Sequence, residues 1–157
     1  MKNFLIVLLL SAFAAGGYAM IETMSLEQLT ASSDLVVSAN LLGVKETGKT
    51  PEGVDICANL AEITEVFKGE LTVGEKIKIK TFPSFEDSVK FSEGKKYLLF
   101  LQKQENHFIV TNSVQGSWEV DEQGKFMGMG TGKSIEEVKK AIDAKPAPKT
   151  EVPDLQL

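Results

Sequence analysis

The chain has 157 residues, 43% of them hydrophobic, and a formal net charge of −5. This length and composition fit one globular domain and exclude collagen, a coiled coil and a disulfide-rich scaffold. The acidic charge argues against nucleic acid as a partner, because phosphate binding requires a positive surface. With one histidine and one cysteine, a site built on these ligands is not expected, so we predict no metal and no cofactor.

The beginning of the chain has the pattern of an export signal. A positively charged start, Met1-Lys2-Asn3, precedes an apolar stretch, and Gly17-Tyr18-Ala19 places small residues where a signal peptidase inspects them. We expect a signal peptide over residues 1–19, cleaved after Ala19, with cleavage after Ala14 as the alternative. A membrane anchor is less favoured, because spanning a bilayer takes about 20 apolar residues. The mature protein is therefore expected in the periplasm or secreted, without a stable membrane span.

The first predicted element after the signal is a short helix over residues 25–33. Ser25 can cap this helix, and Gln28 completes a capping box. A strand rich in Val and Leu follows over residues 35–44. Residues 45–53 have no apolar member and contain Gly and Pro, so they predict an exposed loop.

A second long strand is predicted over residues 54–67. The apolar residues from 54 to 60 share one parity, whereas Ala61 and Ile63 take the other. Side chains alternate strictly along a strand, so this change requires an inserted residue or a sharp bend. We expect the bend near residues 60–62, where it would let one strand serve two halves of a closed or nearly closed barrel.

The clearest alternation in the chain predicts a strand over residues 75–82, with its isoleucines inward and its lysines outward. The outward stripe consists of Lys76, Lys78 and Lys80 and is a candidate binding surface for an anionic polymer. No aromatic residue lies between these lysines for stacking. A solvated sheet face, or an edge protected against aggregation, is therefore the favoured interpretation.

The following segments complete a β-rich domain. A loop over residues 83–94 carries its own apolar residues and is expected to fold partly onto the core. Residues 97–101 are apolar on both faces and predict a central strand that is covered on each side. Further strands are predicted over residues 107–114 and 118–120. Strands that follow one another through short loops favour an antiparallel sandwich or small barrel.

The end of the chain predicts a second helix and a tail. Ser134 and Glu137 form a capping box that opens an amphipathic helix to about residue 144. Residues 145–157 are rich in proline and predict a disordered tail. The single folded domain is therefore expected over residues 20–144.

Few residues form a chemical motif. Residues 128–134 resemble a phosphate-binding loop, but Met127 stands where the first glycine is required, so a connection to a capped helix is favoured. No Gly-x-Ser-x-Gly motif offers a nucleophile to His107. Trp118 is either a ligand platform or a core residue. Cys57 has no partner in its chain and is expected as a partly buried thiol or a site of intermolecular pairing.

Several segments together resemble a known group of proteins. They are residues 33–37 (Ser-Asp-Leu-Val-Val), 65–69 (Glu-Val-Phe-Lys-Gly), 74–79 (Gly-Glu-Lys-Ile-Lys-Ile) and 91–100 (Phe-Ser-Glu-Gly-Lys-Lys-Tyr-Leu-Leu-Phe). The chain resembles small exported bacterial proteins with a domain similar to tissue inhibitors of metalloproteinases and netrin-like modules. The resemblance covers roughly residues 33–120. It implies an OB-type barrel of five main strands.

The inhibitory site of the tissue inhibitors of metalloproteinases, which are animal proteins, has no counterpart in this sequence. In those inhibitors a cysteine at the mature N-terminus chelates the zinc of the protease, whereas the expected first residue here is Met20. The one cysteine of this chain, Cys57, lies far along the sequence. The resemblance therefore implies a fold and assigns no site residue.

We predict a mainly β protein, a small antiparallel OB-like barrel with a short N-terminal helix and a C-terminal helix. The favoured function is an exported, non-enzymatic module that binds a protein or an envelope ligand. One alternative is a secreted protease inhibitor that uses the loop over residues 45–53 or the mature N-terminus. The other is a hydrolase built around His107.

Overall fold

The computed structural model describes residues 22–144. The signal peptide predicted over residues 1–19, its cleavage after Ala19 and the tail predicted over residues 145–157 all lie outside the described residues. Every helix within residues 22–144 is too short or too polar to cross a membrane.

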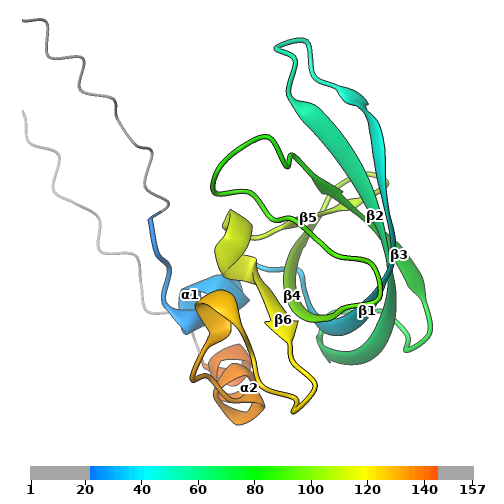
Figure 1. Cartoon of the computed structure of the whole chain (residues 1–157). Helices are drawn as coiled ribbons and strands as arrows, with labels where there is room; N and C mark the ends of the chain where they lie inside the picture. The colour runs from blue at the N-terminus through cyan, green and yellow to red at the C-terminus, as the bar shows by residue number, and fades with distance from the viewer. Residues whose placement is uncertain (1–21, 145–157) are drawn as a thin grey trace, which may run out of the picture.

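The predicted small OB-like barrel is confirmed (Figure 1). Five strands close it in the order β1-β2-β3-β5-β4, and β4 pairs with β1 again. All neighbours are antiparallel except β3 and β5, which are parallel. A sixth strand, β6, pairs with β4 outside the closed ring. The strands are β1 (Leu35–Lys49), β2 (Asp55–Lys68), β3 (Lys76–Thr81), β4 (Lys96–Lys103), β5 (Phe108–Val110) and β6 (Ser117–Val120).

Both predicted helices form, and both have their capping boxes. The Oγ of Ser25 accepts a hydrogen bond from the Gln28 amide at 3.1 Å, and that of Ser134 accepts one from the Glu137 amide at 3.2 Å. The two helices lie side by side at the lower left of the barrel in Figure 1. The helices are α1 (Leu26–Ala31) and α2 (Ile135–Asp143), with the 3₁₀ turns η1 (Ser113–Gly116) and η2 (Gly128–Gly130).

Strand β4 separates two apolar cores, as its two-faced sequence predicts. Leu99 and Leu101 face the interior of the barrel, whereas Leu98 and Phe100 face the second core against the helices. All four side chains are fully buried. Alternation along a covered strand thus joins the barrel to its helical layer.

The prediction of a loop over residues 45–53 is wrong for residues 45–49. Strand β1 continues to Lys49, where Lys49 pairs with Asp55 of β2, and only residues 50–54 form the turn. The extended hairpin projects beyond the barrel (Figure 1). Polar residues suit such a ribbon because both of its faces contact water.

The change of parity predicted in β2 near residues 60–62 is wrong, although β1 has an inserted residue, Leu42, opposite Leu60 and Ala61. Asn59, Ala61 and Ile63 keep one parity and are all buried. The other register irregularities of this pair lie at Thr47 in β1 and at Thr64 and Phe67 in β2. The prediction failed because it took the asparagine as outward-facing.

The amide nitrogen of the inward Asn59 finds partners, while its Oδ1 has none within the described residues. Its Nδ2 donates hydrogen bonds of 2.9 Å to the Ile79 carbonyl oxygen and to the Thr81 Oγ1. A buried amide is tolerated when it is hydrogen-bonded. The outward Leu60 is correspondingly 37% exposed.

Candidate functional site

A groove opens between β3 and β5, where the barrel wall has the fewest paired residues. These strands are paired only at Ile79 and Phe108. Beyond that pair, residues 80–82 line one side of the groove and Ile109 and Val110 line the other. Its volume is about 1060 Å³. The groove is thus a gap in the barrel, lined by two strand ends and the segments next to them.

The lining of the groove is mainly apolar. Two of its side chains are unusually exposed for their type: Phe85 at 56% and Met129 at 49%. Exposed apolar groups in a concave region are typical of binding sites. The main apolar lining residues are Phe82, Phe85, Val89, Ile109, Val114 and Met129.

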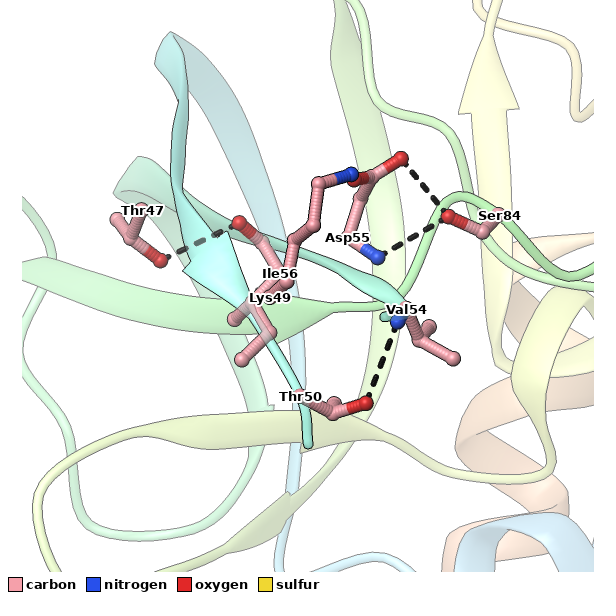
Figure 2. A network of polar contacts seen from close by, with 7 residues as sticks. All are labelled: Thr47, Lys49, Thr50, Val54, Asp55, Ile56 and Ser84. Atoms are coloured by element: carbon pink, nitrogen blue, oxygen red, sulfur yellow. Dashed lines mark hydrogen bonds and ion pairs between the residues drawn. The ribbon is translucent and has the colours of Figure 1, made fainter. Parts of the chain in front are cut away.

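The loop that carries Phe85 is anchored to the projecting hairpin (Figure 2). The Ser84 Oγ donates a 2.9 Å hydrogen bond to the Asp55 carboxylate and accepts one of 3.1 Å from the Asp55 amide. Lys49 forms an ion pair with the same carboxylate. Hydrogen bonds from Lys49 and Ser84 lower the pKa of Asp55. One end of the loop is therefore fixed by charged and hydroxyl groups.

The other end of the loop is tied to the opposite wall. The Ser113 Oγ donates a hydrogen bond to the Asp87 carbonyl oxygen. Asn112 and Ser113 have φ values of +50° and +53°, a left-handed conformation that is uncommon for residues other than glycine. The strand predicted over residues 107–114 is therefore too long, since the chain leaves the sheet after Val110 and turns here.

The start of the described chain lies against the same groove. Thr23 is one of its lining residues. The buried Gln115 side chain holds the neighbouring Met24: Oε1 accepts from the Met24 amide at 3.0 Å, and Nε2 donates to the Met24 carbonyl at 2.6 Å. The Asn112 Nδ2 donates to the Glu22 carbonyl at 2.9 Å. The wall thus already binds one segment of main chain through side-chain amides.

One hydroxyl of the groove has no partner. The Ser88 Oγ is buried and makes no hydrogen bond within the described residues. Buried hydroxyls normally have a partner. The loop beside the groove therefore carries one unsatisfied polar atom.

The candidate lysines lie on the outer face of β3, as predicted. Lys76 and Lys78 are exposed, while the alternating Ile77 and Ile79 are buried. Lys80 is half-buried and is the one member of the stripe that reaches the groove. The stripe as a whole is thus separate from the groove.

The structure places Trp118 in the second core. Its side chain is 2% exposed, and its Nε1 donates a 2.8 Å hydrogen bond to the Gln115 carbonyl. The ring packs between Phe100 and Phe126, with centroid distances of 5.0 and 5.3 Å. Of its two sequence interpretations, the structure therefore supports the core residue.

The remaining reactive side chains among the candidates are His107 and Cys57. The half-buried His107 has its Nδ1 3.0 Å from the Oδ1 of Asn106. Cys57 on β2 is also half-buried, and burial raises the pKa of its thiol, as do the carboxylates of Glu46 and Asp55. Within residues 22–144, no three His, Cys, Asp or Glu side chains are grouped so that they could hold a metal ion.

Sequence reasoning missed the groove. Its lining comes from the chain start, β3, the loop after it, β5, η1 and η2, which no spacing in the sequence connects. The available signal was Phe85, one of the apolar residues of the loop predicted over residues 83–94.

Comparison with protein-family models finds no match for this chain, and a search of curated proteins finds no relative. The functional argument therefore begins from the groove.

Proposed function

We propose that the protein is an exported, non-enzymatic binding module that takes an apolar peptide segment of a partner protein into the groove. The observation that carries this proposal is the half-exposed pair Phe85 and Met129 in a groove of about 1060 Å³. Covering apolar surface stabilises a complex by about 25 cal/mol per Å². The leader pattern of residues 1–19 supports the export in this proposal.

A peptide suits the groove better than a purely apolar ligand. The Gln115 side chain on the groove wall already pairs with the main chain of Met24. Strand ends that diverge after Ile79 and Phe108 also offer edges for an added strand. The resemblance to inhibitor and netrin-like modules favours a protein partner as well.

The test starts from a library of displayed random peptides, panned against the mature chain. Affinities of the selected peptides are then measured by fluorescence polarisation for the wild type and for the Phe85→Ser and Met129→Ser variants. We expect each variant to weaken binding about tenfold, because it removes apolar area that the peptide covers.

The matched control is Val73→Ser, which removes a 61% exposed apolar side chain outside the groove. This variant should leave the affinity unchanged. A library that yields no peptide, or equal losses for Val73→Ser and Phe85→Ser, would refute the proposal.

The projecting hairpin favours a second candidate function, protease inhibition. Its turn over residues 50–54 stands clear of the barrel (Figure 1), and the hairpin is anchored beside the turn by the network of Lys49, Asp55 and Ser84 (Figure 2). Inhibitors of proteases bind with little backbone movement. A panel of metallo- and serine proteases tests this candidate, and no inhibition at micromolar protein ends it.

A further inference from the structure

The outer face of strands β1, β2 and β3 combines lysines with exposed leucines. Strand β2 lies between the other two, so the register of both pairs arranges the outward positions in rows across the face. We call this surface the lysine face. Its three rows, each given from β1 through β2 to β3, are Lys45, Ala58 and Lys80; Gly43, Leu60 and Lys78; and Asn40, Glu62 and Lys76.

The lysine face is positive, although the chain as a whole has a net charge of −5. Glu62 is the one carboxylate in the three rows. Lys45, Lys76 and Lys78 are exposed, whereas Lys80 is half-buried beside the groove. None of these lysines forms an ion pair within residues 22–144. Their charges are therefore available to an anionic partner.

Other acidic residues of β1 and β2 lie outside the lysine face. Toward the end of β2, the exposed Glu65 pairs with Ser38, beyond the row of Glu62. Toward the tip of the hairpin, Glu46 pairs with Cys57 and so lies on the opposite side of the ribbon from Lys45. Since the acidic chain repels anions overall, attraction to an anionic surface has to come from a local positive face such as this one.

Exposed apolar side chains lie among the lysines. Leu60 and Leu42 are each 37% exposed, and Leu42 is the inserted residue of β1 opposite Leu60. Gly43, which pairs with Leu60, adds no side chain to cover it. A partner that carries only negative charge would leave these leucines in water. An amphiphilic partner would pair with the lysines and also cover the leucines.

We propose that the lysine face binds the surface of a lipid bilayer that contains anionic phospholipids. The lysines contact the phosphate headgroups, while Leu42 and Leu60 reach the boundary of the acyl chains. Long lysine side chains allow both contacts, because their ammonium groups stay at the headgroup level. This peripheral contact is independent of peptide binding in the groove.

The test is flotation of the mature chain with lipid vesicles at low salt. The vesicles contain phosphatidylcholine with about one quarter phosphatidylglycerol, and vesicles of phosphatidylcholine alone are the neutral reference. We expect flotation with the anionic vesicles only, and release when the salt concentration is raised, because salt screens the attraction. No flotation with anionic vesicles, or equal flotation with both kinds, would overturn the proposal.

Substitution of two lysines tests the electrostatic part. Lys76→Gln combined with Lys78→Gln should weaken binding to anionic vesicles about 30-fold, since each lysine near such a surface contributes about fivefold. The matched control is Lys103→Gln combined with Lys125→Gln, which removes the same charge from exposed lysines outside the lysine face. The control should bind as the wild type does. Equal losses in the two variants would overturn the proposal.

Substitution of a leucine tests the apolar part. Leu60→Ser should weaken vesicle binding about fivefold and leave peptide binding unchanged, and Leu42→Ser is the second variant if Leu60→Ser fails to fold. Phe85→Ser is the control, because it removes an exposed apolar side chain of the groove and should leave vesicle binding unchanged. Unchanged vesicle binding in both leucine variants, or a soluble polyphosphate that binds the lysine face while vesicles do not, would overturn the proposal.

Discussion

The barrel wall differs between its two sides. Six consecutive register pairs join β1 to β4, from Leu35↔Leu101 to Asn40↔Lys96, whereas β3 and β5 share the single pair Ile79↔Phe108. The β1–β4 side carries buried apolar groups on both faces. The β3–β5 side diverges into the groove. We infer that the closed side supplies stability and the open side supplies a surface for binding.

The largest change in stability should come from a substitution on the closed side. Phe100→Ala removes a fully buried ring at the centre of the second core, so we expect a loss of about 3–5 kcal/mol in the free energy of unfolding. Chemical denaturation followed by circular dichroism measures this loss. Val73→Ala is the exposed control and should stay within about 0.5 kcal/mol of the wild type. A Phe100→Ala loss below about 1 kcal/mol, the size of an average substitution, would contradict this assignment.

A smaller loss of stability is expected from a substitution at Gly130, whose backbone packs against the same core. A Cβ atom added at Gly130 would lie 2.4 Å from Cδ2 of the Trp118 ring, so the ring or the backbone must shift. Gly130→Ala should cost about 1–3 kcal/mol, as overpacking does. Gly43→Ala is the matched control, since nothing lies within 4 Å of its added Cβ. Equal stability of the two variants would show that Trp118 is loosely packed.

A substitution on the open side should weaken peptide binding without changing the stability of the fold. Phe85 is 56% exposed, so Phe85→Ser should change the free energy of unfolding by no more than about 0.5 kcal/mol while it weakens peptide binding. Denaturation and fluorescence polarisation on one preparation give both quantities. A variant that unfolds easily would mean that Phe85 belongs to the core.

The smallest effect concerns the anchor of the loop. The folded-state pKa of Asp55 is depressed, chiefly by Lys49, so its contribution to stability is present above its unfolded pKa of about 3.9. That contribution is lost as the pH falls through the lower, folded value. Denaturation of the wild type and Asp55→Asn across pH 2–5 should therefore show a small difference that disappears at the acidic end. A difference that is constant over this range would contradict the anchor.

Sequence reasoning succeeded where the determinants were local. Ser25 and Gln28 specify a helix start within four positions, and the alternation of Ile77 and Ile79 with lysines specifies both a strand and its faces. It failed at Asn59, because the partners that allow this amide to be buried are on another strand.

The groove is a still harder case for prediction. Phe85 and Met129 are separated by more than forty positions in the sequence. The residues next to each of them indicate only an exposed apolar side chain. Only the early end of β5 and the left-handed turn at Asn112 create the gap they share. Such a site depends on where pairing stops, which residue patterns within single strands do not record.

The most direct test of the groove is amide chemical-shift mapping on the mature protein during titration with a selected peptide. The expected result is that the largest changes fall at the groove, at Thr81, Ile109 and Val114. Changes concentrated at Lys76 and Lys78 on the outer face of β3, with the groove unaffected, would contradict it.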